Sequence, residues 1–148
     1  MWIHKLVSSV LGIGYLKGGG TWAALVWCVG WYALGVDGFG VGALVTTLLI
    51  FVVGVWSANM VEADWGKDSS KVVIDEVAGM AVSLLFLPFA LRYIAMAFVL
   101  FRFFDIVKPF YIKRAEKFPG GWGVMIDDVI AGICANGVVQ GALALKLI

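Results

Sequence analysis

Residues 40–60 contain no acidic or basic side chain and form a run long enough to cross the hydrocarbon core of a bilayer. The 148-residue chain as a whole is 62% hydrophobic and 14% charged, with a mean hydropathy of +0.98. An ordinary soluble domain has about 25% charged residues. We therefore expect an integral membrane protein with one domain over residues 1–148, because this length leaves no room for a separate soluble domain.

The hydropathy pattern predicts an all-α fold, an integral membrane helical bundle of four to five transmembrane helices with an interfacial N-terminal helix. Residues 6–16 are apolar but too few to cross a bilayer, so they are expected to form that interfacial helix. Pro88 should stop a helix that carries Asp75 and Glu76 in its first turn, and the glycine-rich run 120–123 should break the chain again. The expected spans are residues 21–36, 40–60, 75–87, 90–107 and 124–147.

Charge and cysteine usage exclude several kinds of partner. A net charge of +1 provides no field that would recruit nucleic acid, and nothing in the pattern indicates an oligomer. Cys28 and Cys134 lie in apolar stretches without C-x-x-C spacing, so we expect packing residues and not a disulfide or thiolate site. With a cytoplasmic N-terminus, most Lys and Arg residues fall on the cytoplasmic side, as the positive-inside bias requires. No small-residue cleavage site is evident, so no cleaved signal peptide is expected.

Charged residues also lie beside or within the apolar segments, where ionisable groups are usually functional. They form three groups, Asp75-Glu76, then Arg102, Asp105 and Lys108, then Asp127-Asp128. The middle group has a spacing of three, which places neighbours on one helical face within reach of each other. An ion pair that only neutralises itself is the alternative, but it does not account for three charges on one helix and two acidic doublets elsewhere. Carboxylates and cations that converge suit a divalent metal and a phosphate ester.

The doublets and the glycine run each allow two interpretations. Consecutive helical residues diverge by about 100°, so at least one acid of each doublet is expected to be a ligand or base, and the other to hold a neighbouring lysine or to cap the helix start. Plain N-terminal capping by the doublet is the alternative. Residues 18–21, Gly-Gly-Gly-Thr, could form a backbone nest for phosphate with Thr21 as N-cap, or could serve close helix packing.

The motifs of known phosphatases narrow the choice of catalytic mechanism. His4 is the only histidine, neither cysteine has C-x5-R spacing, and D-x-D-x-T is missing, which leaves chemistry at a carboxylate-bound metal. A proton- or cation-coupled membrane carrier that uses intramembrane carboxylates is the alternative function. A carrier should place its charges near the bilayer midplane and often has inverted repeats, whereas these acids lie toward one face. A membrane scaffold without catalysis would leave the charge groups unexplained.

Three strings resemble the phosphatidylglycerophosphatase A family, in the family's order: DSSKVVIDEVAGM at 68–80, FRFFDIVKP at 101–109 and GGWGVMIDDVIAG at 120–132. The resemblance implies magnesium-dependent hydrolysis of phosphatidylglycerophosphate to phosphatidylglycerol and inorganic phosphate. It also implies a multi-pass protein of the bacterial cytoplasmic (inner) membrane, with the active site toward the cytoplasm. One departure lies at residues 12–25, where both prolines of the family's glycine-rich pattern are missing and Lys17 is available for a phosphate contact.

The resemblance and the charge pattern together imply roles for single residues. The expected Mg²⁺ ligands are Asp68, Asp75, Glu76, Asp105, Asp127 and Asp128. The same acids without Asp68 are the candidate catalytic residues, one of them as general base or nucleophile. The substrate phosphate would be bound by Arg102, Lys108, Gly20 and Thr21. The expected partners are the phospholipid substrate and the bilayer.

Overall fold

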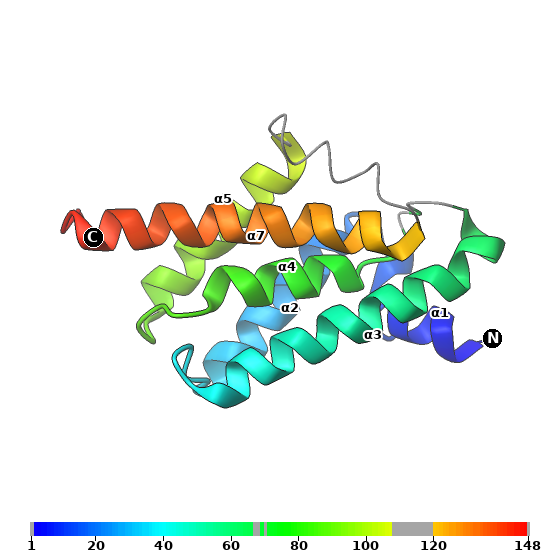
Figure 1. The fold of residues 1–148 in the computed structure, drawn as a ribbon, viewed down its shortest axis with the longest axis horizontal. Coiled ribbons are helices and arrows are strands. Elements are labelled where there is room, and N and C mark those ends of the chain that lie inside the picture. Colours follow the sequence, from blue (N-terminus) through cyan, green and yellow to red (C-terminus); the bar gives the residue numbers. More distant parts are fainter. Residues whose placement is uncertain (1, 67–68, 70, 108–119, 148) are drawn as a thin grey trace.

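The computed structural model describes residues 2–66, 69, 71–107 and 120–147, and over these residues it is all-helical, without strands (Figure 1). The elements in chain order are α1 (Trp2–Ser8), the short 3-10 helix η1 (Ile13–Tyr15), α2 (Gly19–Ala33), α3 (Val41–Trp65), α4 (Ile74–Leu84), α5 (Leu91–Val107) and α7 (Gly120–Ala144). The all-α class predicted from the sequence is confirmed for this part of the chain.

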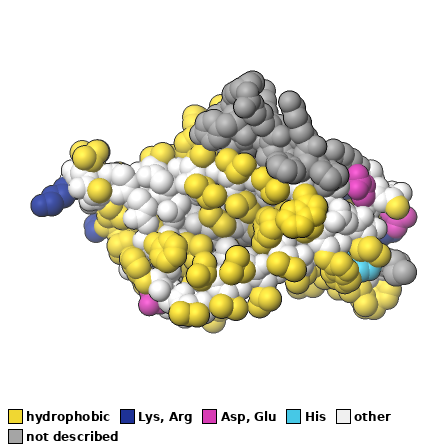
Figure 2. Space-filling model, viewed as in Figure 1, with side chains coloured by type: hydrophobic (Ala, Val, Ile, Leu, Met, Phe, Trp, Pro, Cys, Tyr) yellow, Lys and Arg dark blue, Asp and Glu magenta, His cyan; other side chains and the backbone are white. Residues whose placement is uncertain are grey.

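Two of the described helices, α3 and α7, are long and apolar enough to cross a membrane. They are fewer than the four to five spans expected from hydropathy, because α2, α4 and α5 have only 15, 11 and 17 residues. A perpendicular crossing takes about 20 residues. Figure 2 shows a face on which hydrophobic side chains cover the middle, while the visible charged side chains gather at the two ends. This distribution suits a protein whose middle lies in lipid.

Helix α4 is the centre of the packing, in contact with α2, α3, α5 and α7, and it lies alongside α7 in Figure 1. Nine of its eleven residues are buried, including Met80 and Leu84 in the largest hydrophobic cluster. Phe101 of α5 is fully buried in the same cluster. The short helix is therefore stabilised by burial on nearly every side and not by its length.

The crossing of α4 and α7 depends on two glycines. A Cβ atom on Gly132 would overlap the carbonyl oxygen of Gly79, and one on Gly79 would overlap the Phe101 ring and lie 2.6 Å from the carbonyl oxygen of Asp128. The backbones can approach this closely only because neither residue has a side chain. Asp75 and Asp128 each lie four residues before one of these glycines, so the close crossing brings the acids together.

Several predicted boundaries were wrong. The helix expected over 6–16 ends at Ser8, because Val10, Leu11 and Gly12 have positive φ angles, and only η1 follows. The helix expected to reach Leu87 ends at Leu84, where Leu85 becomes extended ahead of Pro88. Helix α3 extends past residue 60 to Trp65.

The expected chain break at residues 120–123 was also wrong, because these glycines form the first turn of α7. Gly121 N–H donates to Asn59 Oδ1 at 2.6 Å. A Cβ atom on Gly121 would lie 2.6 Å from the carbonyl oxygen of Val55. The glycines here permit α7 to pack tightly on α3, and this packing overrides their low helix propensity.

Candidate active site

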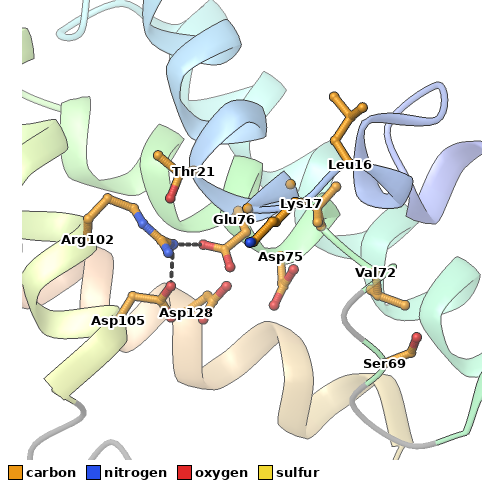
Figure 3. Close-up of a pocket in the computed structure, with 14 residues that line it drawn as sticks. Leu16, Lys17, Thr21, Ser69, Val72, Asp75, Glu76, Arg102, Asp105 and Asp128 are labelled. Carbon is orange, nitrogen blue, oxygen red and sulfur yellow. Dashed lines mark hydrogen bonds and ion pairs between the residues drawn. The ribbon is translucent and has the colours of Figure 1, made fainter.

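A cavity of about 420 Å³ lies where the first turns of α2 and α4 meet the last turns of α5 and the middle of the N-terminal half of α7 (Figure 3). Its polar side chains are Lys17, Thr21, Ser69, Asp75, Glu76, Arg102, Asp105 and Asp128. Four stretches that are distant in sequence, 17–21, 69–76, 102–105 and the turn at Asp128, therefore contribute to one polar site. Ser69 was not predicted from the sequence, where nothing distinguishes it from other loop serines.

Asp75 and Glu76 both line this cavity, although consecutive helical residues were not expected to face a common cleft equally. Their side chains diverge as predicted, but the cavity is wide enough to receive both. Asp75 lies beside the acids of α7, and Glu76 reaches Arg102 on α5. Both acids lie in the first turn of α4, as predicted, where the helix dipole favours an anion, although the N-cap itself is Val73 and makes no side-chain capping bond.

The second doublet lies about two turns inside α7, so capping of that helix is excluded for Asp127 and Asp128. Asp128 lines the cavity, whereas Asp127 does not, but it lies close behind. Carboxylate oxygens gather in two groups that share Asp128: one with Asp75 and Asp127, the other with Glu76 and Asp105. Within each group the oxygens lie within 4.8 Å of one another.

Arg102 bridges two of the acids. Its Nη1 donates to Glu76 Oε2 at 2.7 Å and also to Asp105 Oδ2, the i+3 neighbour on the same helix (Figure 3). The contact of Arg102 with Asp105 confirms that the two share a helical face. Because one guanidinium holds both carboxylates, it orients Glu76 and Asp105 toward the centre of the cavity.

The acids of the cavity that Arg102 does not contact are only partly compensated by hydrogen bonds within the protein. Oδ1 of Asp75 and Oδ2 of Asp128 are buried and have no hydrogen-bond partner among the described residues. A buried carboxylate oxygen without a partner is costly, and the cost falls when a cation binds it. A set of donors made only of carboxylate oxygens fits hard divalent cations such as Mg²⁺. The site residues therefore suit one or two such ions.

The first turn of α2 forms another wall of the cavity. Gly18, with φ +70°, is the N-cap of this helix, so the prediction of Thr21 as N-cap was wrong and Thr21 lies inside the first turn. Gly20 and Thr21 both line the cavity. A Cβ atom on Gly20 would lie 2.6 Å from Glu76 Oε1, so the glycine leaves room for the Glu76 carboxylate in its present position. The N–H groups of a first helical turn lack intrahelical partners and favour an anion.

Lys17 precedes this turn, and its side chain points into the cavity toward Asp75 and Glu76 (Figure 3). It forms no ion pair with any described residue, whereas Arg102 has two carboxylate partners. Within the described part of the chain, Lys17 is thus a cation at the cavity without a carboxylate partner, and it can meet an incoming anion. Asp68 and Lys108, which were also predicted as site residues, lie outside the described residues.

Comparison with known proteins gives a family match over most of the chain. Residues 6–143 match the family described as Phosphatidylglycerophosphatase A. A Bacteroides thetaiotaomicron protein named "Putative phosphatidylinositol-3-phosphatase" is 40% identical over 118 residues, or 78% of this chain and 74% of that protein. Proteins named "Phosphatidylglycerophosphatase A" from Haemophilus influenzae and Escherichia coli are 40% and 33% identical, each over 81% of this chain and over 76% and 71% of their own lengths. No solved structure is detectably similar.

Proposed function

Because the chain belongs to the phosphatidylglycerophosphatase A family and is therefore a phosphatase, we propose that it hydrolyses phosphatidylglycerophosphate to phosphatidylglycerol and inorganic phosphate with the help of magnesium. One observation carries the proposal: two clusters of carboxylate side chains, which have Asp128 in common, lie beside Lys17 and Arg102. Acidic side chains that can bind a metal cation and basic side chains that can bind a phosphate lie in one cavity, as metal-assisted hydrolysis of a phosphate ester requires.

The proposed ligands of magnesium are Asp75, Glu76, Asp105, Asp127 and Asp128, with Asp68 as a further candidate. Bound magnesium would neutralise phosphate charge and activate the attacking water. One carboxylate of the set accepts the proton that this water loses. Arg102 keeps Glu76 and Asp105 oriented and offers its positive charge to the phosphate.

On the other side of the cavity, Lys17 and the first turn of α2 at Gly20 and Thr21 bind the phosphate oxygens. Lys108, three residues after Asp105, is proposed as a further phosphate contact. In this arrangement the ester phosphate lies between carboxylates that hold the metal and donors that hold its oxygens.

We further propose a multi-pass protein of the bacterial inner membrane in which α2 and α5 complete a bundle of four to five spans with α3 and α7. A helix shorter than the bilayer core can be accommodated by local thinning or by long flanking side chains. The cavity would face the cytoplasm, because residues 66–73, between α3 and α4, and residues 108–119, between α5 and α7, carry six of the 11 basic residues of the sequence.

A second substrate is a phosphatidylinositol phosphate. The Bacteroides thetaiotaomicron relative is named for this substrate class and is as similar as the Haemophilus influenzae one, at 40% identity. Both substrates present a phosphomonoester on a phospholipid headgroup, so both could use the same ligands. They differ in the size of the headgroup, a glycerol or an inositol ring.

The test is phosphate release from each lipid by the purified protein in mixed micelles, with magnesium or with excess chelator. We expect turnover of phosphatidylglycerophosphate in magnesium and none in chelator. Asp128→Asn should lower the rate by roughly a hundredfold or more, because Asp128 belongs to both clusters of carboxylates and the variant removes its charge from each. Asp37→Asn is the matched control, since Asp37 is exposed in the turn before α3, away from the cavity, and only accepts a bond from Phe39 N–H.

Three results would contradict parts of the proposal. Faster turnover of phosphatidylinositol 3-phosphate would establish the second substrate. Full activity in chelator would exclude the metal. Equal losses in the Asp128 and Asp37 variants would mean that Asp128 has no special role in the reaction.

A further inference from the structure

An apolar groove of about 340 Å³ lies between α2 and α5. Buried Cys28 and Ile94 form its floor, and exposed Leu25, Val29 and Val99 form its edges. Apart from the Cys28 thiol and a tyrosine hydroxyl, its lining side chains are hydrocarbon. With a buried floor and exposed edges, the groove opens sideways from the bundle.

The groove begins where the polar cavity ends. Leu25 lies four residues after Thr21 on α2, and Phe98 lies four residues before Arg102 on α5. Residues four apart share a helical face and are separated by about 6 Å along the axis. Since α2 starts at the cavity and α5 ends there, both helices lead from polar cavity to apolar groove in the same direction.

Two stacked aromatic rings lie near the end of the groove that is farther from the cavity. Tyr32 lines the groove and stacks on Phe89, with ring centroids 5.5 Å apart and an interplanar angle of 9°. Tyr32 lies eleven residues beyond Thr21, which corresponds to about 16 Å along a helix. The groove therefore has a definite length from the cavity to this stack.

We propose that the groove holds one acyl chain of the phospholipid whose phosphate occupies the polar cavity, and that the stack of Tyr32 and Phe89 limits the chain length. The inference rests on the proposed lipid phosphatase function. A phospholipid joins a charged headgroup to hydrocarbon, and the protein offers a charged cavity followed by a hydrocarbon-lined groove in the same order. The occupant is the substrate's own chain, because only that chain is tethered to the headgroup in the cavity.

We expect the groove to promote turnover by positioning the lipid headgroup. A chain that leaves the bilayer exchanges one apolar environment for another, so the hydrophobic effect contributes little to its binding. A chain held along α2 and α5 instead restricts the tilt and rotation of its headgroup, which aligns the phosphate between Lys17 and the acids. Substrates with chains too short to follow the groove should lose this alignment.

The first measurement compares a long-chain dioleoyl with a short-chain dibutanoyl phosphatidylglycerophosphate in mixed micelles. Ala95→Phe places a ring in the groove two turns away from Arg102. We expect its turnover of the long-chain lipid to fall by about tenfold, and its turnover of the short-chain lipid to stay within about twofold of the parent. Ala144→Phe, an exposed position on α7, is the control and should change neither. Tyr32→Ala should move the optimum toward longer chains, because it removes one ring of the stack that is proposed to limit the chain.

The second measurement does not depend on turnover. A phosphatidylglycerophosphate with a diazirine on one acyl chain should crosslink to peptides of α2 and α5, and unlabelled substrate should compete while phosphatidylcholine should not. Equal competition by phosphatidylcholine, or equal losses of Ala95→Phe on both lipids, would overturn the acyl-chain assignment. A parent that crosslinks as expected but releases no phosphate would instead contradict the proposed function and leave the groove assignment standing.

Discussion

Two cations at the cavity have different surroundings and should have different roles. Arg102 is held by Glu76 and Asp105, so much of its charge orients these acids. Lys17 has no ion-pair partner among the described residues, and it directly precedes Gly18, the N-cap of α2. An ammonium that lines an acidic cavity, with no ion pair to the residues that the structure describes, is suited to attract and bind a phosphate dianion.

We therefore expect Lys17→Gln to raise KM for the lipid substrate and the inhibition constant of inorganic phosphate by about tenfold each, which corresponds to roughly 1.4 kcal/mol. The turnover number should change less, because the carboxylates are intact. Lys17→Arg should restore binding, since the charge is kept. Steady-state kinetics with phosphate as a product inhibitor measure all three values.

Lys71→Gln is the control for loss of a nearby positive charge. Lys71 lies over the rings of Tyr15 and Trp65 and does not line the cavity. If its loss raises the phosphate inhibition constant as much as the loss of Lys17 does, the effect comes from the general field and Lys17 has no direct contact.

At the level of helices, the site depends on the close crossing of α4 and α7 at Gly79 and Gly132. This contact sets the separation of Asp75 and Asp128, which lie one turn away on the two helices. A side chain at Gly132 would push the backbones apart, because it would meet the Gly79 carbonyl, which cannot rotate away, and one at Gly79 would meet both the Asp128 carbonyl and the buried Phe101 ring.

Gly132→Ala should lower the free energy of unfolding by about 1–3 kcal/mol through overpacking against the Gly79 carbonyl. It should also reduce activity, since the two acids move apart. The matched variant on the same helix is Gly137→Ala, where an added Cβ meets no atom within 4 Å and helix propensity should add up to about 1 kcal/mol. Thermal unfolding in detergent, followed by circular dichroism, separates the two. Equal melting temperatures would show that the crossing tolerates a larger separation.

At the level of the whole molecule, polar groups lie at opposite ends of an apolar body. The cavity with Ser69 lies at the ends of α3 and α5 and the starts of α2 and α4, whereas Asp37 lies in the turn between the opposite ends of α2 and α3. This separation makes the proposed orientation measurable with single cysteines.

In a background with Cys28→Ala and Cys134→Ala, Ser69→Cys should react with an impermeant thiol reagent only after the cells are permeabilised. Asp37→Cys should react in intact cells, because that turn is exposed at the far end. Mass spectrometry of the labelled protein reads both. The reverse pattern would place the cavity on the outer face of the membrane.

The helical class and most helix positions were predictable, because in lipid only helices or closed barrels satisfy the backbone and long uncharged runs identify the helices. The acids and Arg102 were also named from the sequence as candidate site residues, because charged side chains are rare and costly in apolar segments. Helix ends were less predictable. Residues 120–123 read as a break, but the fit of Gly121 against Val55 and Asn59 makes them helical.

The sequence by itself determined that this is an apolar helical protein with the acidic motifs of a phosphatase family, because composition and motif order are properties of the chain alone. Only the tertiary structure decided that Asp128 belongs to two clusters of carboxylate side chains. It also decided that Arg102 pairs with Glu76 and that Lys17 points into the same cavity. Spacing along one helix predicts which residues share a face, as for Arg102 and Asp105. It carries no information on the distance between different helices, which here is set by the close contact of glycine backbones.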